Sequence, residues 1–168
     1  MTSPQQPATY PASPYPGYVL MPAQPPKNRV GIVGAVVTVL GALTALAGTA
    51  LHWYSVGGID IDLHDIEQAT SPSGAKALPH TYFGWLLWVL LALTIVAALL
   101  ANVPGPLSTT LRVLSPLLGV LSVILLLASL GQLQRDRSVF DDATVGLWAI
   151  VIGFIVTGFG GVFGPRRH

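Results

Sequence analysis

The sequence predicts an all-α membrane protein in which four transmembrane helices form a bundle behind a disordered, proline-rich N-terminal tail. Of the 168 residues, 52% are hydrophobic and only 9% are charged, whereas a soluble domain carries about 25% charged residues. The charges are also segregated, because four stretches of roughly 20 residues contain no Asp, Glu, Lys or Arg. A helix can cross a bilayer alone, since it satisfies its own backbone hydrogen bonds.

Each charge-free stretch has about the 20 residues that a helix needs to cross ~30 Å of hydrocarbon. The first stretch is too long for the apolar region of a signal peptide, so we expect it to stay in the mature chain. The segment 102–106, Asn-Val-Pro-Gly-Pro, predicts a tight turn between two antiparallel spans. The predicted spans cover approximately residues 30–51, 83–103, 112–131 and 144–163.

A tail and two outer loops complete the predicted organisation. Residues 1–28 hold eight of the fourteen prolines and carry no charge before Lys27, a composition with too little apolar surface to fold. We expect this tail to be disordered, although its P-x-x-P spacings would also fit the aromatic groove of a partner. The other parts are a transmembrane domain (29–164) with outer loops 52–82 and 132–143, and a basic end (165–168).

The basic residues predict the orientation. Only three of the eight, Lys76, Arg135 and Arg137, lie in the two outer loops. Positive residues are retained on the cytoplasmic side, so we expect both termini in the cytoplasm and the protein in the inner membrane. The basic residues assigned to the cytoplasmic side are Lys27, Arg29, Arg112, Arg166 and Arg167.

Small residues recur at helical spacing in the first and fourth spans. Small side chains let helix backbones approach closely, and in lipid this contact drives helix association. We therefore expect these two spans to pack on each other or on a partner helix. The second span is rich in leucine and lacks such a face, so it is expected to meet lipid. The predicted helix-packing glycines are Gly31, Gly34, Gly41, Gly48, Gly146, Gly153 and Gly160.

Aromatic residues gather near the outer ends of the spans. Their amphipathic rings prefer the level of the lipid headgroups. A belt on one side indicates that the outer end meets a partner or lipid, or that arginines alone anchor the inner end. The members of this predicted collar are Trp53, Tyr54, Trp85, Trp88 and Trp148.

The first outer loop is acidic. Residues 59–63 alternate apolar and polar, which predicts a short strand, but Asp62 could instead cap a helical turn. On a strand, Asp60, Asp62 and His64 would share one face and offer a metal two carboxylates and an imidazole. A solvated acidic loop is the favoured interpretation, so no metal and no cofactor is predicted.

The spans themselves lack the groups that intramembrane chemistry requires. Proton relays, ion pathways and intramembrane hydrolases need buried ionisable side chains, and none lies in the four charge-free stretches. With no cysteine, thiolate and disulfide chemistry are excluded. The net charge of +1 indicates no nucleic-acid partner. We therefore expect a protein that is not an enzyme.

The layout of four spans, cytoplasmic ends and a large first outer loop resembles the claudin architecture. It lacks that family's Trp-Gly-Leu-Trp and paired cysteines, because this loop opens His-Trp-Tyr-Ser-Val at residues 52–56. The Pro/Tyr/Gln-rich tail before Ala/Leu/Val/Gly-rich spans also resembles small actinobacterial membrane proteins, among them accessory subunits of Mce-type lipid importers. That resemblance implies a helper bound to a transporter permease.

The leading functional hypothesis is a non-enzymatic accessory subunit of a larger inner-membrane complex for envelope lipid transport. Its partners would be membrane lipids and other integral membrane proteins. The alternative is a membrane protein that binds a lipid or envelope ligand at its outer Trp collar and acidic loop. A third hypothesis, a metal-dependent enzyme, would use Asp60, Asp62 and His64.

Overall fold

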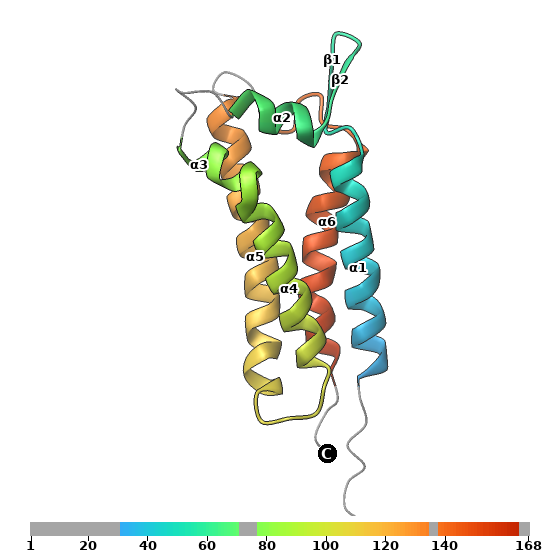
Figure 1. Cartoon of the computed structure of the whole chain (residues 1–168). Coiled ribbons are helices and arrows are strands. Elements are labelled where there is room, and N and C mark those ends of the chain that lie inside the picture. Colours follow the sequence, from blue (N-terminus) through green and yellow to red (C-terminus); the bar gives the residue numbers. More distant parts are fainter. Residues whose placement is uncertain (1–30, 71–76, 135–137, 165–168) are drawn as a thin grey trace, which may run out of the picture.

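The computed structural model describes residues 31–70, 77–134 and 138–164 (Figure 1). It confirms the predicted fold class, because four of its helices are long and apolar enough to cross a membrane. The predicted tail and basic end lie outside the described residues. These four helices run over Ile32–Ala50 (α1), Leu78–Ala101, Ser108–Leu133 (α5) and Val145–Phe163.

Two of the four helices are composite. The second begins with α3 (Ala77–Thr81), continues through a π-helical turn, η1 (Tyr82–Leu86), and ends as α4 (Leu87–Ala101). The fourth consists of α6 (Val145–Gly160) and a closing 3₁₀ turn, η2 (Gly161–Phe163). The 19 residues of α1 rise about 28 Å at 1.5 Å per residue, which matches the ~30 Å hydrocarbon core.

Two spans extend beyond their predicted starts. The second begins at Leu78 instead of 83, because Pro79 is tolerated in the first turn of a helix, where no intrahelical N–H bond is lost. The third begins at Ser108, ahead of Arg112. A criterion based on absent charge stops at Arg112, but a long arginine side chain near a helix end can reach the polar interface.

The helices form one antiparallel bundle. The most extensive contact joins α1 to α6, and α4 packs on α5, while α6 also contacts α4 and α5. α1 begins and the fourth span ends at the same end of the bundle as the turn between α4 and α5 (Figure 1). We call this the terminal end, and the opposite end, which carries α2 and the hairpin, the loop end.

A small cap folds over the loop end. Strands β1 (Tyr54–Val56) and β2 (Ile59–Ile61) form an antiparallel hairpin, and α2 (Leu63–Thr70) runs across the top of the helices (Figure 1). Gly57 and Gly58 make the hairpin turn with φ of 60° and 83°, the left-handed region that a two-residue turn requires. Both sequence interpretations of residues 59–68 therefore apply in part, because the strand ends at Ile61 and a helix follows.

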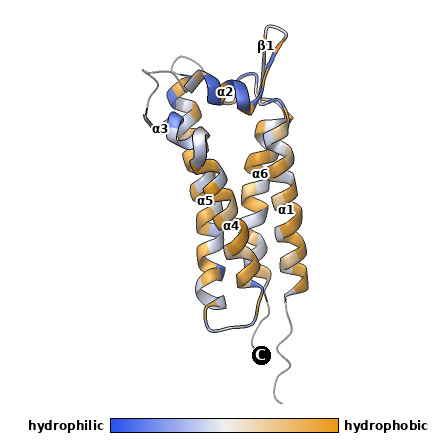
Figure 2. Cartoon of the chain, in the orientation of Figure 1, coloured by the Kyte–Doolittle hydropathy of each residue, from blue (hydrophilic) through white to orange (hydrophobic). Residues whose placement is uncertain are grey.

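The four spanning helices carry apolar side chains on the outer surface of the bundle as well as in its interior. Figure 2 shows hydrophobic residues along the spans and hydrophilic residues on α2. Only 33% of the apolar window of α1 and 50% of that of the fourth span are buried within the bundle. Soluble proteins rarely expose such continuous apolar surface, and this surface instead suits contact with lipid.

The second span is more deeply packed than its leucine-rich sequence predicts. Thr94, Ala98 and Ala101 on α4 are fully buried, so the expectation that this span lacks a small-residue packing face was wrong. Small residues do form a packing face on it, but the face is confined to the last turns of α4. The opposite face, with Leu93 and Val96, is exposed.

Candidate functional site

The α1/α6 seam is the tightest helix contact in the structure. Its α1 side consists of Gly34, Gly41 and Gly48, all buried. A Cβ atom added to Gly41 would lie 2.5 Å from the backbone nitrogen of Thr157, and one added to Gly48 would lie 2.6 Å from that of Ile150. Because the obstructing atoms are backbone, only glycine permits this helix separation.

The α6 side of the seam is built in the same way. A Cβ atom added to Gly153 would lie 2.6 Å from the Cα atom of Ala45. One added to Gly160 would lie 2.7 Å from the backbone nitrogen of Thr38. At Gly146 it would lie 2.8 Å from the carbonyl oxygen of Leu51. The two sets of glycines therefore face each other inside one chain, and they are not available to dock a partner helix.

Gly31 has a different position from the other predicted packing glycines. It precedes α1 and is half-buried. Its backbone N–H donates to the carbonyl oxygen of Asn102 at 3.0 Å, which ties the start of α1 to the end of α4.

A second close contact, between α5 and α6, includes a residue that the sequence pattern did not single out. Gly158 faces α5, where an added Cβ would lie 2.8 Å from the carbonyl oxygen of Ser115. Ser115 Oγ donates to the carbonyl oxygen of Gly158 at 3.0 Å. Gly119 on α5 belongs to the same contact, because an added Cβ would lie 2.7 Å from the carbonyl oxygen of Phe154. The four-residue spacing of Ser115 and Gly119 was the available signal in the sequence.

Asn102 is a buried polar residue whose sequence context indicates only a turn. Its side chain, 1% exposed, donates to the carbonyl oxygens of Ala98 at 2.8 Å and Gly160 at 3.3 Å. Together with the bond from Gly31, these contacts join α1, α4 and α6 at the terminal end. Asn102 therefore acts as a structural connector of three helices.

The buried hydroxyl groups within the spans are satisfied internally. Five of them donate to the carbonyl oxygen four residues earlier in the same helix, the usual arrangement for Ser and Thr in apolar helices. Such bonds satisfy each hydroxyl hydrogen within its own helix. These donors are Thr38, Thr94, Ser122, Ser129 and Thr157.

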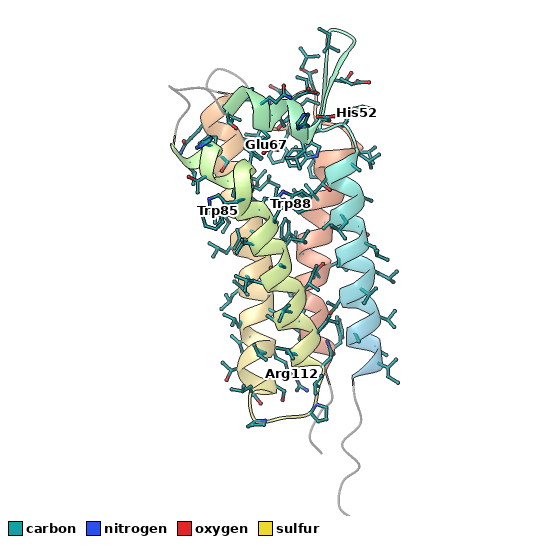
Figure 3. The ribbon with its side chains drawn as sticks, in the orientation of Figure 1. His52, Glu67, Trp85, Trp88 and Arg112 are labelled. Atoms are coloured by element: carbon teal, nitrogen blue, oxygen red, sulfur yellow. The ribbon has the colours of Figure 1, made fainter. Side chains whose placement is uncertain are left out.

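The predicted aromatic collar divides into buried and exposed members. Trp53 is 0% exposed, and its indole Nε1 donates to Gly48 O at 2.9 Å. Trp85 is 56% exposed and Trp88 45% exposed, and both project from the second span beneath α2 (Figure 3). Trp148 is 46% exposed and stacks on Phe140 with ring centroids 5.5 Å apart. Only the exposed three can reach lipid or a ligand.

Tyr54 belongs to the interior of the cap. Its hydroxyl donates to the carbonyl oxygen of Val139 at 2.9 Å, and burial raises the pKa of Tyr54 to about 12. Its backbone forms a bridge with Ala143. Trp53 and Tyr54 therefore fasten the loop-end cap to the helices, a role that their position in the sequence did not distinguish from lipid contact.

The acidic residues do not form the shared strand face that a metal would need. Asp60 lies in β2 opposite Ser55, whereas Asp62 follows the strand and His64 lies in α2, where it contacts Gln68 at 2.9 Å. The alternative in which residues 60, 62 and 64 share a strand face does not apply, because β2 ends at Ile61 and α2 begins at Leu63. Within the described residues no group of three or more His, Cys, Asp or Glu side chains is placed to hold a metal ion.

Asp62 and Asp65 form a reciprocal cap at the start of α2. The Asp65 backbone N–H donates to Asp62 Oδ1 at 2.9 Å, and the Asp62 N–H donates to Asp65 Oδ2 at 3.1 Å. This arrangement satisfies N–H groups that would otherwise be left unbonded at the helix start. The Asp65 backbone bond is the main cause that lowers the pKa of Asp62.

The cap predicts an acid-sensitive α2. Because the folded pKa of Asp62 is below its unfolded value of about 3.9, its contribution is complete above that value and is lost as the pH falls through the folded pKa. We expect the protection of α2 amides, measured relative to their intrinsic exchange rate at each pH, to fall below about pH 4. Asp62→Asn, which caps as well without titrating, should remove the contribution of this residue. Equal acid sensitivity in both proteins, measured by hydrogen–deuterium exchange, would contradict the assignment.

Comparison with known protein families, with curated proteins and with solved structures gives no significant match.

Proposed function

We propose that this protein is a non-enzymatic interaction subunit of a larger membrane complex. The supporting observation is that the buried hydroxyls of the spans bond to backbone within the bundle. Among the described residues, the ionisable side chains of the spans lie near the ends of the helices. Arg112, at the terminal end, is an example (Figure 3). Transport or intramembrane catalysis would require such groups at the middle of the bundle.

The partner surface in this proposal is the outer apolar face of the bundle together with the loop-end cap. The α1/α6 seam is internal, so a partner would have to meet larger side chains such as Leu40 and Leu43, which are exposed on α1. The resemblance to accessory subunits of Mce-type importers supports a permease for envelope lipids as the partner. In this proposal the termini face the cytoplasm and the protein resides in the inner membrane.

Quantitative co-purification tests the proposed role. We expect the full chain, expressed at its native level and extracted in mild detergent, to recover one integral membrane protein at a fixed ratio. That protein, tagged in turn, should recover this chain at the same ratio. A four-span protein of similar abundance serves as the control for non-specific capture. A chain that elutes alone after reversible crosslinking in intact membranes would contradict the role.

A further inference from the structure

A cavity of about 330 Å³ lies beneath the cap at the loop end. It is lined by the hairpin, by one side of α2 and by the end of α5, and α2 runs between the hairpin and the top of α5 (Figure 1). Its volume is at the lower end of the range of about 300–1,000 Å³ for small-molecule sites. The lining residues are Tyr54, Val56, Ile61, Asp65, Ile66, Ala69, Leu130, Leu133 and Gln134.

Most of the lining is aliphatic, and the cavity lies where α5 leaves the apolar zone. Leu130 and Leu133 belong to the last turns of α5, which ends at Leu133. An apolar chain entering from the membrane boundary would therefore meet Ile66 from α2 on one side and these leucines on the other. At about 30 Å³ for each heavy atom, the cavity holds roughly eleven such atoms.

The polar lining offers a ligand two acceptors, the buried amide oxygen of Gln134 and the solvent-accessible carboxylate of Asp65. The hydroxyl hydrogen of Tyr54 is already donated to Val139 O. The amide of Gln134 bonds to the Tyr54 side chain, and its Oε1 is buried without a hydrogen-bond partner in the described part of the chain. Asp65 adds a carboxylate, of which one oxygen accepts the Asp62 N–H at 3.1 Å.

The charge at this end is complementary to a cation. The two outer loops of the sequence contain all seven acids and only three basic residues, and a concentration of one sign raises the local concentration of ions of the opposite sign. A buried acceptor without a partner costs free energy that a donor group on a ligand would recover.

We propose that this cavity binds a single-chain amphiphile with an ammonium head group. The alkyl chain lies between Ile66 and the α5 leucines, and the ammonium donates to the Asp65 carboxylate and to Gln134 Oε1. An alcohol of the same length could donate only one uncharged hydrogen bond to these acceptors, and an anionic head group would be repelled by the carboxylate. The site does not depend on the interaction role, because it lies in the cap and involves no partner protein.

Binding of decylammonium to the full chain in phosphatidylcholine nanodiscs tests the site. This probe has eleven heavy atoms, and empty nanodiscs measure its partition into lipid. We expect saturable binding of one probe per chain, with decanol at least tenfold weaker because it lacks the charge-assisted bonds. Equal affinity for decanol, or binding no greater than in empty nanodiscs, would overturn the proposal.

Two substitutions locate the probe. Ala69→Trp should fill the cavity and abolish saturable binding, whereas Gln68→Trp, on the same helix but outside the lining, should leave it unchanged. Val56→Trp repeats the test from the hairpin if the first variant does not fold. Asp65→Asn should weaken decylammonium about tenfold and leave decanol unchanged. Unaltered binding in both cavity-filling variants would contradict the location.

Discussion

Replacing Gly41 with leucine is expected to force α1 away from α6 and to destabilise the bundle by about 3 kcal/mol or more. Even the first side-chain atom would lie 2.5 Å from the backbone nitrogen of Thr157 and 2.9 Å from the carbonyl carbon of Val156. Backbone atoms inside a helix cannot move aside as the end of a side chain can. The helices must therefore separate, and the close contact along the seam is lost.

Gly131 provides the matched control. It also lies in a spanning helix, but an added Cβ would meet only Val139 Cγ2, at an ordinary 3.7 Å. The free energy of unfolding of the Gly131→Leu protein should therefore lie within about 1 kcal/mol of that of the unaltered protein, because exposed substitutions usually have small effects. The free energy of unfolding in mixed micelles of increasing denaturing detergent measures both variants. Equal stability of the two would show that the α1/α6 seam does not hold the bundle together.

Replacing Trp53 with alanine is expected to cost about 3–5 kcal/mol, the usual range for a fully buried tryptophan. Trp53 packs edge-on against Phe83, with ring centroids 6.0 Å apart. Its indole N–H also donates a hydrogen bond to the carbonyl oxygen of Gly48. This carbonyl lies in the last turn of α1, where no helical N–H is left to bond it. The variant should lose the cap first, so amide exchange in α2 should increase more than exchange in α4.

Two further substitutions separate packing from hydrogen bonding at this position. Trp53→Phe keeps a ring but leaves Gly48 O without its donor, which should cost about 1–3 kcal/mol. Trp85→Ala removes a tryptophan of the same predicted collar that is largely exposed, so it should change the free energy of unfolding by about 1 kcal/mol or less. A Trp53→Ala protein as stable as Trp85→Ala would contradict the assignment of Trp53 to the core.

The number and type of spanning helices could be predicted because hydrocarbon imposes a simple rule. Charge is excluded from about 20 consecutive residues, and backbone bonds must be made within the segment. The boundaries of the helices were predicted less accurately. Arg112 lies in the first turns of α5, whereas a criterion based on absent charge excludes it. The π-helical turn at Tyr82–Leu86 had no recognised signal in the sequence.

The sequence indicated which residues belong to close-packed or boundary positions, but not which part of the structure each of them contacts. Glycine spacing indicated that one face of α1 packs closely, yet it could not distinguish α6 from a second protein. For the collar, the preference of tryptophan for the membrane boundary applies equally to a ring that faces lipid and to one that closes the core. The cavity could not be predicted, because it is formed by Ile66 and Leu130, residues from elements far apart in the sequence.

Four membrane-length helices, two of them with a face of small residues, could be predicted from the order of residues along the chain. These are local properties, since apolar length and residue size are read along a single segment. Two outcomes follow only from the packed bundle: the glycines of α1 and α6 face each other, and Trp53 is buried while Trp85 is exposed. Each of these outcomes depends on which surfaces meet after the chain has folded back on itself, and that is set by the packing of all four helices together.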